Sequence, residues 1–97
     1  MIITQLEGKV STDKQDILKN AFDKALLQMP SAIKASYLLQ DKNDSDIWRV
    51  LTIWHSREAL QAYRQSVEVP EGVLMFREAG SEPTLCINEV IEHSLSG

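Results

Sequence analysis

Cysteine and basic residues are both scarce in this sequence of 97 residues. The single cysteine, Cys86, excludes an internal disulfide and any Cys-x-x-Cys metal or redox motif. Ten Lys and Arg residues against fourteen Asp and Glu residues give a net charge of -4. A nucleic-acid binder needs a basic face to displace counterions from phosphates, so we expect no nucleic-acid partner. The sequence shows no metal-ligand cluster, nucleophile triad or phosphate loop, and we expect no metal and no cofactor.

Long apolar runs are missing as well. No run approaches the roughly 20 residues that a membrane-spanning helix requires, so we expect no membrane partner. The opening, MIITQLEGKV, lacks the basic segment followed by an apolar one that marks a secretory signal. We therefore expect a soluble cytoplasmic protein. The length predicts one domain over residues 1–97, with a core small enough that oligomerisation would add stability.

Four segments have the pattern of strands. Residues 2–10 alternate between an apolar side and a more polar side, which is the period of a half-buried strand. Residues 47–54, IWRVLTIW, are rich in the β-branched and aromatic residues that favour strands. Residues 32–40 and 84–93 are predicted to be the other two strands.

A first helix is predicted to begin at STDKQ, where Thr12 and Gln15 fit a capping box, and to close at Pro30. Its apolar residues recur at helical spacing and form one stripe. They are Ile17, Leu18, Ala21, Phe22, Ala25, Leu26 and Met29.

Two further helices are predicted in the second half of the chain. Ser56 is a suitable N-cap for the first of them, in which Leu60 and Tyr63 face inward. A short helix follows, with Pro70 in its first turn and Gly80 as its C-cap.

The predicted order is β-α-β-β-α-(short α)-β, an α+β fold of the ferredoxin-like type with a four-stranded antiparallel sheet. Two helices cover only one face of such a sheet. The third strand is nevertheless apolar on both sides, with Trp48, Val50 and Trp54 on one side and Leu51 and Ile53 among those on the other. A second copy of the sheet is the simplest cover for the other face. We therefore expect a homodimer through sheet faces, a dimeric α/β barrel.

The stretch LTIWHSREALQAYRQS, residues 51–66, joins a strand ending in Trp54 to a helix with the Ser56 cap, Leu60 and Tyr63. It resembles the antibiotic biosynthesis monooxygenase family of dimeric α/β-barrel proteins, and the element order extends the resemblance over nearly the whole chain. That family includes cofactor-free oxygenases of polyphenols and quinols, haem-degrading oxygenases, signal-molecule isomerases and members with no known activity. The resemblance implies a pocket in each protomer, between the sheet and the helices.

The same resemblance allows the haem-degrading branch to be tested by residues. Those enzymes resemble this chain at Trp54 but have a Trp where Tyr63 stands, and a haem-ligand His ten residues later, where this chain has Val73. They also place an Asn on the first strand, near Glu7, whereas no Asn precedes Asn20 here. Quinol-type members often have His at the Tyr63 position. We therefore expect that haem is not a physiological ligand.

Three residues are candidates for catalysis: Tyr63, Glu7 and His55. The Tyr63 hydroxyl suits a hydrogen bond to a phenolic ligand, although an aromatic on the buried side of a helix is equally explained by packing. Glu7 would be a base if it were desolvated inside the barrel, and otherwise an ion-pair partner of Arg49 or Lys9, which we favour. His55 is a candidate because an imidazole suits proton transfer near neutrality, but it follows Trp54 directly and so points to the opposite face, toward a partner or solvent.

The remaining residues are assigned to packing. We expect the pocket lining to include Trp54, Phe22, Leu60 and Phe76. Cys86 is expected to be a small buried hydrophobe, and His93 to be exposed.

Two functions remain open at this point. The first is a cofactor-independent monooxygenase of a small aromatic or quinol-like compound, in which the pocket helps to deprotonate the ring and the anion reacts with dioxygen. The alternative is a non-catalytic dimeric protein that binds a small apolar ligand.

Overall fold

A computed structural model describes residues 1–95 of the chain. None of the helices in this part of the chain is long and apolar enough to cross a membrane. The elements, in order, are β1 (Ile2–Lys9), the 3-10 turn η1 (Thr12–Lys14), α1 (Gln15–Leu26), β2 (Ile33–Gln40), β3 (Ile47–Trp54), α2 (Arg57–Ser66), α3 (Glu71–Glu78) and β4 (Thr84–Glu89).

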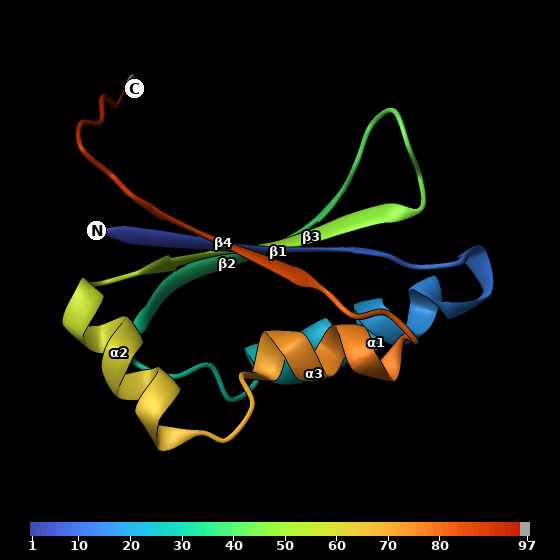
Figure 1. The fold of residues 1–97 in the computed structure, drawn as a ribbon, viewed down its shortest axis with the longest axis horizontal. Helices are drawn as coiled ribbons and strands as arrows, with labels where there is room; N and C mark the ends of the chain where they lie inside the picture. Colours follow the sequence, from blue (N-terminus) through green and yellow to red (C-terminus); the bar gives the residue numbers. More distant parts are fainter. Residues whose placement is uncertain (96–97) are drawn as a thin grey trace.

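The four strands form one antiparallel sheet in the order β2-β3-β1-β4. All three α-helices lie on the same side of this sheet, and the other side is bare (Figure 1). The predicted ferredoxin-like α+β fold is confirmed. The predicted bounds of β2 and β3 agree with the structure to within one residue, whereas β4 ends four residues earlier than expected.

The predicted start and end of the first helix are wrong. No side chain caps α1, and η1 precedes it where the capping box of Thr12 and Gln15 was expected. Gln15 instead donates from Nε2 to the carbonyl oxygens of Val10 and Ser45, at 3.2 and 3.0 Å, which attaches the start of α1 to the β2–β3 loop. The helix ends at Leu26, four residues before Pro30. Its last turn tightens, because the N–H groups of Leu27 and Gln28 donate to the carbonyl oxygens of Lys24 and Ala25, three residues earlier.

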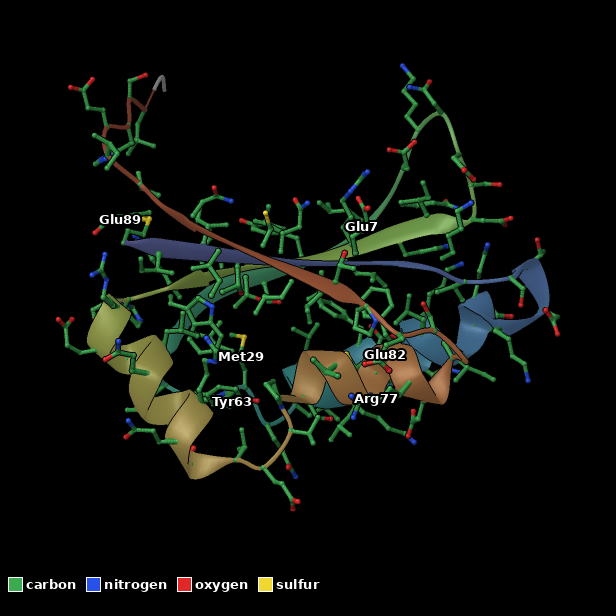
Figure 2. The ribbon with its side chains drawn as sticks, in the orientation of Figure 1. Glu7, Met29, Tyr63, Arg77, Glu82 and Glu89 are labelled. Carbon is green, nitrogen blue, oxygen red and sulfur yellow. The ribbon has the colours of Figure 1, made fainter. Side chains whose placement is uncertain are left out.

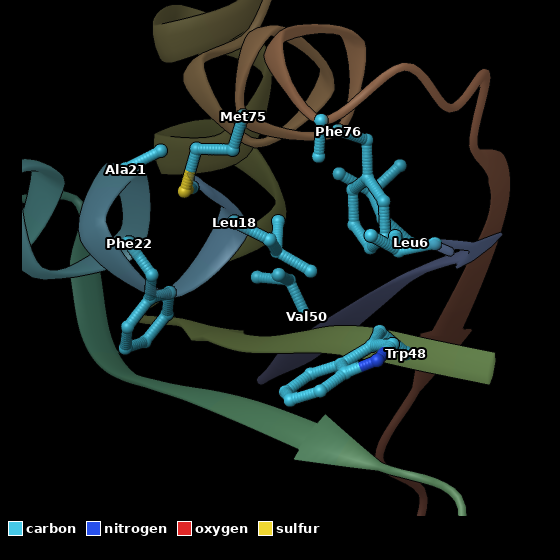
Figure 3. Packing of buried hydrophobic residues seen from close by; sticks show 10 residues of the cluster. Leu6, Leu18, Ala21, Phe22, Trp48, Val50, Met75 and Phe76 are labelled. Atoms are coloured by element: carbon cyan, nitrogen blue, oxygen red, sulfur yellow. The ribbon is translucent and has the colours of Figure 1, made fainter. Parts of the chain in front are cut away.

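The larger part of the hydrophobic core lies under α1 and α3, which pack against each other over one half of the sheet (Figure 3). Gly8 permits this packing, because a Cβ atom there would lie 2.6 Å from Ser81 Oγ and 2.9 Å from Phe76 Cδ1. The buried members of this α1–α3 cluster are Leu6, Val10, Leu18, Ala21, Phe22, Trp48, Val50, Met75, Phe76 and Ala79.

A second, smaller cluster lies under α2 and consists of the buried residues Ile2, Trp54 and Leu60. Tyr63 and Ile33 pack against it from its edge. We call this the α2 cluster. The core of this protein is therefore divided between two groups of helices rather than continuous.

The bare face of the sheet carries a network of charges among apolar residues. Arg49 donates from Nε to Glu7 Oε1 at 2.6 Å and from Nη1 to Asp41 Oδ1 at 2.9 Å. The bond from Arg49 holds the pKa of Asp41 below its ordinary value. Cys86 also faces this side, opposite Gln5 in the register, and it is exposed. The expectation that Cys86 is buried is wrong, because β4 is an edge strand and no helix covers this face.

Candidate functional site

A cavity of about 600 Å³ lies between the sheet and the helices. All four strands and all three α-helices contribute to its lining, which is mostly apolar. Both halves of the core take part, with Leu6, Phe22 and Val50 from the α1–α3 cluster and Trp54 and Leu60 from the α2 cluster. Its volume falls within the roughly 300–1,000 Å³ range of small-molecule sites.

Trp54 and Tyr63 form an aromatic wall of this cavity. Their ring centroids are 5.1 Å apart and their planes are inclined by 44°, a tilted arrangement that suits two aromatic quadrupoles. Ser56 caps the N-terminus of α2, the helix that carries Tyr63, because its Oγ accepts a hydrogen bond from the backbone N–H of Ala59 at 3.0 Å. The predicted N-cap is confirmed. The side chain of Tyr63 points from α2 toward the space under the sheet (Figure 2).

The Tyr63 hydroxyl uses its oxygen, but not its proton, in a hydrogen bond within the protein. Its oxygen accepts a hydrogen bond of 3.0 Å from the backbone N–H of Glu71, the first residue of α3. This bond connects α2 to the start of α3. A phenolic hydroxyl both donates and accepts, so the proton of Tyr63 remains available to a ligand.

Three hydroxyl residues line the cavity on adjacent strands, and sequence reasoning missed them. Thr4 on β1 stands opposite Thr52 on β3, which in turn stands opposite Ser36 on β2. We call these three residues the hydroxyl row. Thr4 Oγ1 accepts from Trp54 Nε1 at 2.9 Å, and the oxygens of Ser36 and Thr52 are 3.0 Å apart. The available signal was polar residues at inward positions of apolar strands.

The charged residues of the lining lie at exposed positions on the helices. They are Lys24 on α1, Arg64 on α2 and Glu71 on α3. The strands contribute no charged residue to the lining, and no histidine lies in it. The local balance is thus two positive charges against one negative charge, although the whole chain is acidic.

The structure brings together four of the residues named from sequence and separates the others. Trp54, Phe22, Leu60 and Tyr63 all lie in the lining of the cavity. Phe76 does not: it is fully buried in the α1–α3 cluster beside Gly8, so its expected place in the lining is wrong. Its position on α3 points it at the sheet rather than at the space between the helices.

Glu7 and His55 lie away from the cavity. Glu7 is on the bare face of the sheet, opposite to the side that Tyr63 occupies (Figure 2), and its carboxylate is paired with Arg49. Its alternative role as an ion-pair partner is therefore the observed one. His55 is exposed and lies in an open depression outside α2, beside Ala59 and Ala62. His93 is exposed, as expected.

Comparison with known proteins places this geometry in context. The family model described as antibiotic biosynthesis monooxygenase matches residues 1–73. No curated protein sequence gives a match.

Solved structures share the fold along the chain at low identity. A candidate antibiotic biosynthesis monooxygenase from Deinococcus radiodurans has a TM-score of 0.72 and 10% identity, with 100% of both chains covered. A candidate antibiotic biosynthesis monooxygenase from Nitrosomonas europaea has a TM-score of 0.71 and 15% identity, with 95% of this chain and 100% of that chain covered. A mutant of MhuD with two manganese protoporphyrin IX molecules bound per active site has a TM-score of 0.73 and 17% identity. The match covers 99% of this chain and 100% of that chain. These identities support a shared fold alone.

The two rings of the aromatic wall should differ in their effect on stability. Trp54→Ala should lower the free energy of unfolding by about 3–5 kcal/mol, because it removes a buried ring and leaves a cavity. Tyr63→Phe should change it by no more than about 1.5 kcal/mol, because it removes one partly exposed hydrogen bond. Denaturant melts of the two variants and the wild type measure both values. An equal loss in the two variants would show that the Tyr63 hydroxyl is a structural group.

Proposed function

Because this chain belongs to the antibiotic biosynthesis monooxygenase family, we propose that it oxygenates a small aromatic or quinol-like compound without a resident cofactor. The observation that carries this proposal is the cavity beside Trp54 and Tyr63. The cavity is mostly apolar and is large enough for a small ring system. Trp54 and Tyr63 offer an aromatic wall on which a ligand ring can pack, and the Tyr63 hydroxyl offers a proton for a hydrogen bond. These are the features that orient a flat phenolic ligand.

The proposed chemistry requires only that the bound substrate loses a proton and meets dioxygen. An electron-rich phenol or quinol loses a proton, and the anion then transfers electrons to dioxygen directly. A ring carbon para or ortho to the hydroxyl loses its hydrogen and gains one oxygen atom as a carbonyl group, and the hydroxyl carbon becomes a second carbonyl. The other oxygen atom leaves as water with the ring hydrogen and the hydroxyl hydrogen, so the substrate itself supplies the four electrons.

Tyr63 is the residue that we assign to the reacting oxygen of the substrate. Its hydroxyl is held by the Glu71 N–H and retains a proton to donate. Glu7 has no part in this proposal, because its carboxylate lies across the sheet and is engaged by Arg49. His55 has none either, because it lies outside the cavity lining.

One observation favours a second function, the binding of a small apolar ligand without turnover. The lining contains no imidazole, and its one carboxylate, Glu71, is exposed at the protein surface. A site that depends on a resident general base would hold one within hydrogen-bond distance of its substrate. Both functions use the same cavity and differ in the consumption of oxygen.

We also propose that two copies of the chain pack through the bare faces of their sheets. Ile3, Leu51 and Ile53 lie side by side on this face, with Tyr37 and Leu39 on the neighbouring strand. Tyr37 is 51% exposed and Leu39 38%, so large apolar side chains face solvent in the single chain. Covering them would remove apolar area from water, which is the main driving force for association.

The charges on this face are compatible with burial. Arg49 already has two carboxylate partners, and its pKa is raised above the ordinary value, first by the bond to Asp41 and then by that to Glu7. A charge that enters an interface with its partners in place avoids the cost of an unpaired buried ion. The three residues can therefore lie in a contact between two sheets.

The oxygenase proposal predicts dioxygen uptake with a panel of quinols and polyphenols. Tyr63→Phe should lower kcat/KM for the best substrate by about ten-fold, because a hydrogen bond worth about 1.4 kcal/mol is lost in the transition state. Tyr37→Phe removes the same hydroxyl on the bare face and is the matched control, with an unchanged rate. An oxygen electrode measures all three proteins.

Two outcomes would contradict this prediction. A wild type that is inert toward the whole panel would favour ligand binding without turnover. An active wild type with an equally active Tyr63→Phe variant would remove Tyr63 from the reaction.

The dimer proposal predicts that a charge at Leu51 separates the two copies. Leu51→Lys should sediment as a monomer at micromolar concentration, because the interface would bury an unpaired ammonium group. Leu74→Lys places the same charge on an exposed position of α3, on the opposite side of the sheet, and should remain dimeric. A wild-type protein that is itself monomeric at this concentration would rule out the proposed dimer.

A further inference from the structure

The hydroxyl row gives the mostly apolar cavity a polar floor. Thr4 is 8% exposed and Thr52 7%, so both hydroxyls are removed from bulk water. They lie between apolar neighbours on each strand, with Ile2 and Leu6 flanking Thr4 on the same side. Buried hydroxyls require hydrogen-bond partners, and each one left without a partner is unfavourable.

The hydrogen-bond inventory of the row leaves two protons without an acceptor. Trp54 is a donor only, so Thr4 must act as the acceptor of that bond and keep its own proton. Ser36 and Thr52 share one bond, which uses one of their two protons. Among residues 1–95 these are the two hydrogen bonds that the three side chains make. Two O–H groups are therefore free to donate into the cavity that the row lines.

The other groups around the cavity also suit negative charge. Tyr63 brings a third free hydroxyl proton, because its oxygen accepts from the Glu71 N–H at the start of α3. Of the charged lining residues, Lys24 from α1 and Arg64 from α2 are positive, and Glu71 from α3 is negative. The strands add no titratable group to the lining. Donors that converge in a cavity of low polarity stabilise an anionic oxygen more strongly than water-exposed donors do.

We propose that the hydroxyl row of Thr4, Thr52 and Ser36 binds the anionic oxygen of the ligand, so that the cavity selects phenolates and enolates over their neutral forms. This inference rests on the proposed function in one respect, namely that the cavity receives a small aromatic compound. It assigns the specificity to three residues of the sheet rather than to the aromatic wall.

The proposal also explains how a cavity without a resident base activates its substrate. The neutral phenol transfers its proton to water, and the resulting phenolate is held by the O–H groups of the row. Charge and protons balance, because one hydronium ion leaves for each phenolate that is bound. The residues of the row hold the oxygen and take no proton themselves, which is the role that preorganised donors have in other anion-stabilising sites.

The test uses 4-nitrophenol, whose ionised form absorbs visible light. We titrate pH with the phenol free and with the phenol bound to the wild-type protein, and follow the visible band. The bound phenol should ionise at a lower pH than the free one. Thr52→Val alone would leave the Ser36 proton free, so it is combined with Ser36→Ala, which removes both hydroxyls of the shared pair. This double variant should move the pH back toward the free value by about one unit, because a hydrogen bond to a charged oxygen is lost.

The variants include controls for folding and for general effects. Thr4→Val removes the acceptor of Trp54 Nε1 and can weaken the fold, so Thr4→Ser, which keeps the hydroxyl, is measured beside it and should behave as the wild type. Thr84→Val makes the same change as Thr52→Val on β4, outside the cavity lining, and should leave the titration unchanged. Calorimetry at a pH where the phenol is ionised should show about ten-fold weaker binding to the double variant Ser36→Ala and Thr52→Val.

Each remaining outcome overturns the inference. The first is a bound phenol that ionises at the same pH as the free one, and the second is a lowered pH that persists both in the double variant Ser36→Ala and Thr52→Val and in Thr4→Val. A protein that binds no 4-nitrophenol at any pH also overturns it. The function is tested separately, because dioxygen uptake with the quinol panel does not depend on where the phenolate oxygen lies.

Discussion

The structure depends on one constraint: three short helices cover one face of a four-stranded sheet, and they do so as two separate groups. α1 and α3 pack together above one half of that face, and α2 packs alone above the other. Each group makes its own apolar cluster with the strands beneath it. The cavity lies where the two clusters do not meet, which is why residues of both line it. The bare opposite face follows from the same shortage of helices.

Trp54 is the residue through which the divided core and the site are connected. Its ring belongs to the α2 cluster, packs on Tyr63 and forms part of the cavity wall. Its indole N–H fixes Thr4 as an acceptor across the sheet and so determines which way the Thr4 proton can point. The same side chain therefore stabilises the fold and orients a polar group of the site. Loss of the ring would affect both at once.

Most of the fold could be predicted from local patterns. The alternation in β1, the apolar β3 and the Ser56 cap identified the sheet, its topology and the helix that carries Tyr63. The doubly apolar β3 also predicted apolar side chains on the face that no helix covers, and Tyr37 and Leu39 on the neighbouring strand are exposed there. The start of α1 could not be predicted, because Gln15 is engaged by carbonyl oxygens near and far in the chain, at Val10 and Ser45, rather than by its own helix.

The site was harder to predict than the fold. Periodicity shows which side of a strand faces inward, but not whether the inward residue meets another side chain or an empty space. Phe76 and Phe22 are both inward aromatics, yet only Phe22 lies where the helices part. The hydroxyl row was missed for the same reason, because alternation places Thr4 and Thr52 on the inward side of their strands without showing that they meet a cavity. Their role depends on how far apart α2 and the α1–α3 pair lie, which no local pattern encodes.

The central claim is that the two halves of the core leave an open cavity between them. Diffraction from a crystal pressurised with xenon tests it most directly, because xenon occupies apolar cavities that side chains leave empty. We expect xenon density bounded by Phe22, Trp54 and Leu60. Side-chain density that fills this space, with no xenon in it, would contradict the account.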